Sequence, residues 1–173
     1  MIASIAVLAA VTLQRAGELV LAARNTRRLK ARGAVESGAE HYPFIVALHG
    51  VWLAALWVLA WNRPMNLWLL GLFALLQMGR IWVIASLGGR WTTRIITLPG
   101  EPLVRRGPYR FIPHPNYVVV AAEIAVLPLV FGLWVYALAF TALNAAMMAV
   151  RIPAEARALK DTRQVVGKPL SRR

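Results

Sequence analysis

Long apolar stretches, separated by short polar and basic segments, run through most of the sequence. A bilayer core requires roughly 20 apolar residues for each crossing helix. The apolar run 116–150 is far too long for one crossing, and Pro128 and the Phe131-Gly132 pair interrupt it. It therefore predicts a tight hairpin, whose short arms leave open whether it crosses fully. We predict an all-α integral membrane protein with about five transmembrane helices, at residues 1–23, 44–61, 67–87, 117–130 and 133–150.

The composition supports a membrane protein, because 59% of the 173 residues are hydrophobic, against about half in a soluble domain. The length leaves room for one membrane domain, residues 1–173, and we place its cofactor-binding and catalytic part at about 88–160. The absence of cysteine excludes disulfides and a thiolate nucleophile. The net charge of +13 does not indicate a nucleic-acid partner, because the basic residues lie between apolar runs, where cytoplasmic loops need them.

The distribution of Lys and Arg predicts the orientation in the membrane. Segments 24–43 and 88–113 contain five each, and the tail 151–173 contains seven. The turn 62–66 contains one, and the Phe131-Gly132 break contains none. With five helices, the three rich segments fall on one side. We therefore predict the N-terminus outside and the C-terminus in the cytoplasm, with 88–113 and the tail on the same face.

A histidine between two prolines stands out in the stretch Arg-Arg-Gly-Pro-Tyr-Arg-Phe-Ile-Pro-His-Pro-Asn-Tyr, residues 105–117. Proline fixes the backbone on both sides of His114, directly before an apolar helix. Free N–H groups and the helix dipole favour an anionic group at such a position. A carboxylate or a sulfonium-bearing amino acid would suit it. The alternative is a loop of interfacial anchors.

Ionisable residues also occur within the apolar runs, where they are costly and suggest a functional site. Arg15 and Glu18 share a helix face and are expected to pair. Arg80 could pair with Glu123 or with Glu18. Glu123 and Asn144, on the two hairpin arms, either contact a ligand or hydrogen-bond to each other across the helices.

Arg151 and Glu155 are four residues apart at the end of the last helix, so their side chains point the same way. The Arg could orient a substrate carboxylate and the Glu could act as a general base, or the two form an ordinary surface pair. Arg94, beside Trp91, is a candidate binding residue or an interface anchor. His41 and His49 have no carboxylate cluster near them, so we predict no metal site.

These segments resemble the isoprenylcysteine carboxyl methyltransferase family. The resemblance rests on 105–117, on the following hairpin and on Arg-Ile-Pro-Ala-Glu at 151–155. Glu40-His41-Tyr42-Pro43, Trp91-Thr92-Thr93-Arg94-Ile95 and Asn144 look like its small bacterial branch, whose members methylate alkylpyrones. It covers roughly residues 36–159.

The resemblance implies that S-adenosylmethionine is the cofactor and that a lipophilic substrate enters sideways from the bilayer. The resemblance places Tyr109, His114, Pro115 and Tyr117 in the cofactor pocket and makes Arg151 and Glu155 the catalytic residues. We predict Arg110, close to His114, as a further cofactor-binding residue. We predict Arg94, Glu123 and Asn144 as substrate-binding residues.

The sequence thus predicts an S-adenosylmethionine-dependent O-methyltransferase. Its acceptor would be a lipophilic carboxylate or an enolic hydroxyl, of the isoprenylcysteine or alkylpyrone kind. The expected partners are this lipophilic small molecule and the lipid bilayer. Two other readings remain: an NADPH-dependent membrane reductase of the sterol-reductase type, and a non-enzymatic small transporter or scaffold. Cofactor preference separates the three.

Overall fold

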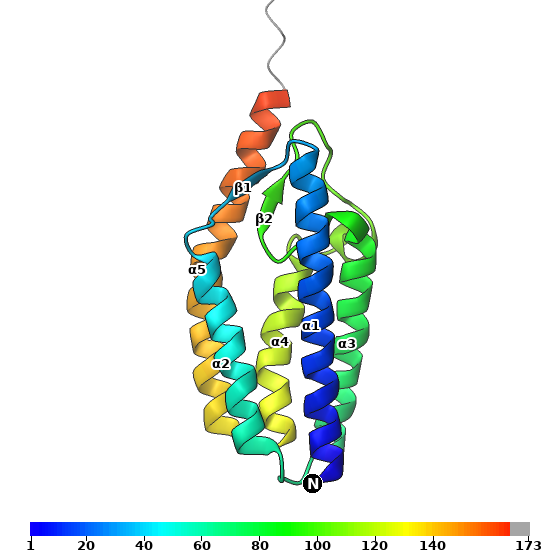
Figure 1. The fold of residues 1–173 in the computed structure, drawn as a ribbon, viewed down its shortest axis with the longest axis vertical. Coiled ribbons are helices and arrows are strands. Elements are labelled where there is room, and N and C mark those ends of the chain that lie inside the picture. The colour runs from blue at the N-terminus through cyan, green and yellow to red at the C-terminus, as the bar shows by residue number, and fades with distance from the viewer. Residues whose placement is uncertain (167–173) are drawn as a thin grey trace, which may run out of the picture.

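Five long helices form the body of the computed structural model, which describes the backbone of residues 1–166 and the side chains of residues 1–160. Part of the predicted basic tail, residues 167–173, lies outside the described residues. Figure 1 shows the helices aligned with the long axis of the molecule, with the N-terminus at one end and a small sheet at the other. The helices are α1 (Ile2–Ala31), α2 (Tyr42–Ala60), α3 (Leu67–Leu87), α4 (Pro115–Val130) and α5 (Trp134–Val166).

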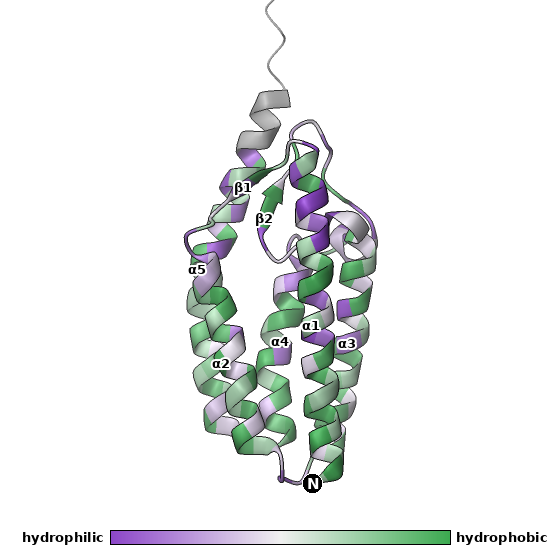
Figure 2. Ribbon diagram, viewed as in Figure 1, coloured by the Kyte–Doolittle hydropathy of each residue, from purple (hydrophilic) through white to green (hydrophobic). Residues whose placement is uncertain are grey.

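Four of these helices, α1, α2, α3 and α5, are long and apolar enough to cross a membrane. The fifth, α4, has 16 residues, which is about 24 Å at 1.5 Å per residue and short of a core of roughly 30 Å. In Figure 2 the hydrophobic residues cover the helical body, and hydrophilic residues gather at the end with the sheet. The chain is therefore an all-α integral membrane protein, as the sequence predicted.

Two predicted helix ends are wrong. Helix α1 continues eight residues beyond the predicted end at residue 23, because Arg, Lys and Leu are good helix formers and the first breaker is Gly33, with φ +86°. Helix α5 continues beyond residue 150 to Val166 with Pro153 inside it. Much of the basic linker and of the tail is therefore helical. The predicted hairpin is confirmed, and its turn includes Gly132 with φ +71°.

A two-stranded antiparallel sheet, which the sequence did not predict, covers the end of the bundle opposite the N-terminus (Figure 1). It pairs β1 (Val35–Ser37) with β2 (Ile95–Thr97), so that Glu36 lies opposite Ile96. Two short 3-10 helices, η1 (Gly88–Arg90) and η2 (Gly107–Arg110), complete this end. The sheet joins the segment after α1 to the segment after α3.

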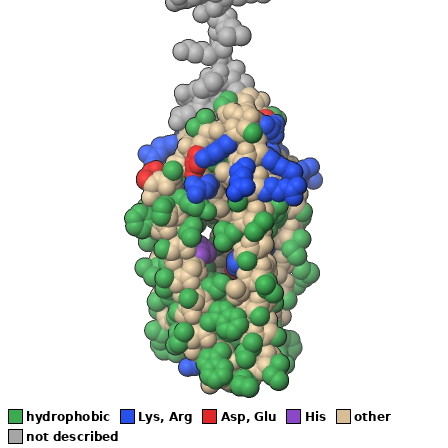
Figure 3. Space-filling model, in the orientation of Figure 1, with side chains coloured by type: hydrophobic (Ala, Val, Ile, Leu, Met, Phe, Trp, Pro, Cys, Tyr) green, Lys and Arg blue, Asp and Glu red, His purple; other side chains and the backbone are tan. Residues whose placement is uncertain are grey.

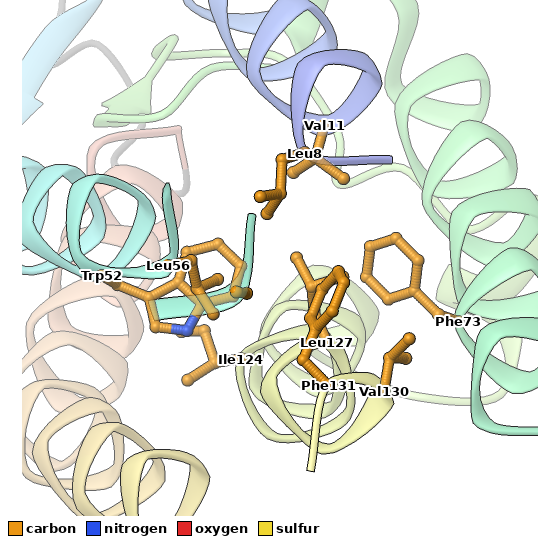
Figure 4. Packing of buried hydrophobic residues seen from close by; sticks show 10 residues of the cluster. Leu8, Val11, Trp52, Leu56, Phe73, Ile124, Leu127, Val130 and Phe131 are labelled. Atoms are coloured by element: carbon orange, nitrogen blue, oxygen red, sulfur yellow. The ribbon is translucent and has the colours of Figure 1, made fainter. Parts of the chain in front are cut away.

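The apolar core lies toward the N-terminal end of the bundle, away from the sheet. Figure 4 shows side chains from α1, α2, α3 and α4 meeting there, with Leu127 and Phe131 between Trp52 and Phe73. Asn66 caps α3 by accepting from two backbone N–H groups, and its own N–H donates 2.8 Å to the carbonyl of Val130 at the end of α4. This packing joins α1, α2, α3 and α4 at the end of the bundle away from the sheet.

Four charged side chains form a closed network inside the apolar body. Arg15 contacts Glu18 at 2.9 Å and Glu123 at 2.8 Å, and Arg80 contacts the same two carboxylates at 2.5 and 3.0 Å. The predicted Arg15–Glu18 pair is confirmed, and Arg80 pairs with both of its predicted alternatives. Two guanidinium groups and two carboxylates are therefore neutralised within the bundle, across α1, α3 and α4.

The predicted hydrogen bond between Glu123 and Asn144 is wrong. Among the described residues, the carboxylate of Glu123 accepts from Arg15, Arg80 and Gln77. The Oδ1 atom of Asn144, which is buried, has no partner there. Glu123 turns toward α1 and α3 because those helices carry guanidinium groups, whereas α5 carries only an amide at this depth.

Candidate active site

The proline-flanked histidine segment and the last helix meet at Tyr117. His114 is the residue before α4, and Pro115 occupies the first turn, where a missing N–H costs nothing. Tyr117 follows on the first turn, and its ring stacks on His114 with centroids 5.5 Å apart. Its hydroxyl donates to Glu155 Oε2 at 2.5 Å and accepts from Arg151 Nε at 2.9 Å. Two segments distant in the sequence thus converge on one phenol.

Arg151 and Glu155 do not form a surface pair with each other. Arg151 is buried, with 7% of its surface exposed, and its Nη2 donates 2.5 Å to the carbonyl of Thr93. Glu155 Oε2 lies 3.4 Å from His114 Nδ1. The i,i+4 spacing on α5 brings both side chains to Tyr117. The hydroxyl of Tyr117 therefore contacts both the guanidinium of Arg151 and the carboxylate of Glu155.

A cavity of about 440 Å³, here called the cap cavity, lies beneath the sheet end beside these residues. Such a volume is typical of small-molecule sites. Its wall comes from β2 and the loop after it, and from the ends of α3, α4 and α5. The predicted site residues that line it are Arg94, Tyr109, His114, Tyr117, Arg151 and Glu155.

Ion pairs hold the sheet over the cap cavity. Glu36 on β1 contacts Lys30 and Arg94, each at 2.5 Å. The hydrogen bond from Lys30 and that from Arg94 lower the pKa of Glu36, despite partial burial, and the bond to Glu36 raises the pKa of Arg94. The guanidinium of Arg94 also lies 4.0 Å from the centroid of the Tyr42 ring. Arg32 pairs with Glu101 in the loop that follows β2.

Tyr109 enters the cap cavity from η2. The turn depends on Gly107, which has φ +57° and lies so close to Ser86 that an added Cβ would be 2.0 Å from its Oγ. Burial raises the pKa of the Tyr109 hydroxyl, and the nearby Glu155 carboxylate raises it further. Tyr109 is therefore a neutral phenol at physiological pH, suited to donate a hydrogen bond or to stack.

A second cavity of about 250 Å³, here called the lateral cavity, opens between α1 and α2. Apolar side chains from α2 line it, together with His49 and part of the buried charge network. Figure 3 shows an opening in this face, surrounded by hydrophobic side chains, with a histidine visible inside.

The two cavities share a wall. The residues common to both linings are Trp91, Thr92, Asn116, Tyr117 and Arg151. Trp91 is 2% exposed, and Asn25 holds its carbonyl at 2.8 Å. Among the described residues, the indole Nε1 of Trp91 and the Oδ1 of Asn116 have no hydrogen-bond partner. An unpaired donor and an unpaired acceptor therefore lie in the partition between the cavities.

Four of the predicted site residues lie outside both cavities. Arg110 is exposed, with its guanidinium 5.8 Å from the centroid of the Phe111 ring. Pro115 is buried and shapes the start of α4. Glu123 and Asn144 are buried between helices at 0% and 1% exposure. Their predicted binding roles gain no support from this geometry.

Three residues without a predicted site role line the cavities: Trp91, Asn116 and His49. Asn116 belongs to the segment 105–117 that contains the proline-flanked His114, so the sequence could have indicated that it lies near the site. Trp91 follows the Gly88-Gly89 break, which marks the end of α3. No local pattern indicated that His49 would line a cavity, because the lateral cavity forms only where α1 and α2 stand apart.

The fold and the site define a helical membrane protein in which a cavity at the loop end meets a cavity that opens from the side of the bundle. Residues 69–161 match the family model of the isoprenylcysteine carboxyl methyltransferase (ICMT) family. The chain belongs to this family. Membership indicates a membrane methyltransferase, and members use S-adenosylmethionine.

A protein of Bacillus subtilis (strain 168), described as uncharacterized protein YpbQ, is 39% identical to the chain over 159 residues. The match covers 89% of this chain and 95% of that protein. No solved structure is significantly similar to the chain.

Proposed function

We propose that the protein is an S-adenosylmethionine-dependent O-methyltransferase that acts on a lipophilic carboxylate or enolic hydroxyl at the membrane. One observation carries this proposal: the cap cavity and the lateral cavity share the wall that contains Tyr117 and Arg151. A reaction between a water-soluble donor and a lipid-soluble acceptor requires two entrances that meet at one point. The family to which the chain belongs supplies the reaction class.

The residues of the cap cavity fit S-adenosylmethionine. Arg90 and Arg94 offer cations for its carboxylate, and Glu155 offers an anion for its amino group. Tyr109 offers an aromatic ring for the adenine. The unpaired Trp91 N–H and Asn116 Oδ1 are further groups that a polar ligand would satisfy. When bound, this cofactor supplies an electrophilic methyl group.

The residues at the shared wall then have to orient the acceptor oxygen, since methyl transfer is an in-line displacement that depends on placing the reacting atoms about 3–3.5 Å apart. Arg151 donates to Tyr117 and Thr93, and its remaining N–H groups have no partner among the described side chains. A carboxylate acceptor would receive hydrogen bonds from them and needs no base. An enolic hydroxyl would lose its proton to Glu155 or His114.

The orientation, with the N-terminus outside and the C-terminus cytoplasmic, is part of the proposal. It rests on the gathering of Lys and Arg side chains at the sheet end of the molecule (Figure 3) and on the preference of cytoplasmic segments for these residues. The cap cavity would then face the cytosol, where the cofactor is made. The lateral cavity would face the bilayer.

Two measurements test the function directly. Calorimetry with the protein in nanodiscs should detect binding of S-adenosylmethionine and no binding of NADPH. His114→Ala should weaken the binding of S-adenosylmethionine and leave the thermal unfolding temperature unchanged. Transfer of a radiolabelled methyl group into a lipid extract should label a product in the wild type. Arg151→Ala and Glu155→Ala should each reduce the labelling; if both variants keep full activity, their catalytic assignment is wrong.

A further inference from the structure

His49 has a fixed tautomer inside the lateral cavity. Its Nδ1 lies 2.8 Å from the backbone carbonyl of Ile45, one turn earlier on α2. A carbonyl oxygen only accepts, so Nδ1 must carry the proton. In the neutral imidazole the other nitrogen, Nε2, is then an acceptor with a free lone pair.

This acceptor has no partner of its own. Among the described residues, no hydrogen bond reaches Nε2 of His49, although the residue lines the lateral cavity. Neighbouring wall residues on α2, such as Val46 and Leu53, are apolar. The charged groups nearby are already paired, because Arg15 and Arg80 contact Glu18 and Glu123. His49 Nε2 is therefore an uncommitted acceptor in a largely apolar space.

His49 lines the lateral cavity together with residues of the shared wall. On α2 the start of the helix lies next to that wall, since the hydroxyl of Tyr42 lies 3.0 Å from Oγ1 of Thr93, the residue after Thr92. Seven residues separate Tyr42 from His49, which is about 10 Å along the helix axis. Arg151 and His49 both line the lateral cavity, so one molecule of the size of a substituted ring or short chain inside it can contact both.

We propose that His49 selects the lipophilic molecule in the lateral cavity by accepting a hydrogen bond from one of its O–H or N–H groups. The inference rests on the proposed function, which makes this cavity the site of the methyl acceptor. It makes His49 a specificity-determining residue. The favoured class is a neutral lipophile that carries a hydrogen-bond donor, and a molecule of the same shape without that donor binds less well.

Two matched probes test this with the full-length protein in nanodiscs: 4-dodecylphenol, which carries an O–H donor, and 4-dodecylanisole, in which a methyl group replaces that hydrogen. Binding is followed by quenching of tryptophan fluorescence. The wild type should prefer the phenol by about three- to tenfold, the value of one hydrogen bond. In protein labelled with ¹⁵N-histidine, the Nε2 resonance of His49 should move with the phenol and stay in place with the anisole.

Three variants complete the test. His49→Phe removes the acceptor and should bring the preference to about one. His49→Gln retains an oxygen acceptor and should keep part of the preference, which guards against a folding defect in the first variant. Leu53→Ala, the matched control, removes apolar wall and should weaken both probes equally. A preference in His49→Phe equal to that of the wild type, or an unmoved Nε2 resonance with bound phenol, would overturn the proposal.

These readouts are independent of methyl transfer. A His49-dependent preference without S-adenosylmethionine binding would leave this inference standing and refute the proposed function. Methyl transfer with no preference between the probes would support the proposed function and refute the role of His49.

Discussion

Tyr117 and Glu155 share a 2.5 Å hydrogen bond between the first turn of α4 and the cytoplasm-directed part of α5 in the proposed orientation. The same hydroxyl accepts from Arg151. A single phenol therefore sets the distance between a guanidinium group and a carboxylate that have no direct contact. Tyr117 therefore contributes to the relative placement of the proposed catalytic groups, together with Thr93 on the Arg151 side and His114 on the Glu155 side.

Tyr117→Phe should separate these groups without removing either. The ring and its stacking on His114 remain, but Arg151 and Glu155 lose their common partner. Misplacement of this kind can cost about 100-fold in rate, so we expect single-turnover methyl transfer to fall by roughly 10- to 100-fold. The control is Tyr136→Phe, which removes a hydroxyl that donates to the Trp52 carbonyl. Equal losses in the two variants would contradict the assignment.

Glu123→Ala should destabilise the protein strongly. The change leaves Arg15 and Arg80 with one carboxylate between them in the apolar interior. Breaking a buried ion pair from one side costs about 3–5 kcal/mol. Unfolding by SDS in mixed micelles measures this loss. Arg63→Ala, at an exposed helix-end position, should change stability by no more than about 0.5 kcal/mol, and a similar effect of both substitutions would show that the network contributes little.

Gly107→Ala should disrupt the cap cavity. Its φ of +57° disfavours a side chain, and the new Cβ would overlap Ser86. We expect η2 to shift, so that Tyr109 leaves its place and cofactor affinity drops by roughly tenfold or more. Gly89→Ala serves as the comparison, because that position has no positive φ and open space around it. Calorimetric titration of both variants with S-adenosylmethionine measures the two affinities, and equal affinities would contradict the prediction.

The sheet should loosen in acid. The folded state lowers the pKa of Glu36, because Lys30 and Arg94 stabilise its carboxylate. A lowered pKa gives stability that is fully present above the ordinary value of 4.5 and is lost as the pH falls through the folded pKa. Hydrogen exchange of the β1 and β2 amides should therefore accelerate below about pH 4.5 relative to Glu36→Gln, which lacks this titration. Parallel pH profiles in the two proteins would contradict this role.

Much of the fold could be read from the sequence, since the apolar runs and the Gly132 turn follow local rules. Counting basic residues predicted that segment 88–113 and the tail lie at the same end of the bundle, but not that His114, Arg151 and Glu155 meet at Tyr117. The pairing of β1 with β2 could not, because three residues on each strand carry no periodic signal and the partners are about 60 positions apart. The partners of Glu123 depended on which helices pack together, and the sequence left those alternatives open.

The two cavities could not be predicted from the sequence, because they too depend on which helices pack together. Trp91 and Asn116 acquire their importance from lying in the partition between two spaces. Such a partition exists only once α1, α2, α4 and α5 have taken their places. Tyr109 and Arg94, predicted as binding residues from their neighbours in the chain, line the cap cavity. Glu123 and Asn144, also predicted as binding residues, lie buried between helices.

The closed charge network also constrains how the chain enters the membrane. Helix α1 carries Arg15 and Glu18, whereas Arg80 and Glu123 arrive on α3 and α4, which are synthesised later. Because Arg15 and Glu18 pair within α1, this helix carries no unpaired charge when it enters the bilayer. Helix α3 carries Arg80, whose partners Glu18 and Glu123 lie on α1 and α4, so we expect its insertion to be helped by α1, which is already synthesised. A chain shortened by its first helix would leave that guanidinium with only Glu123 as an ionic partner, so we expect the N-terminal segment to support the assembly of α3 and α4.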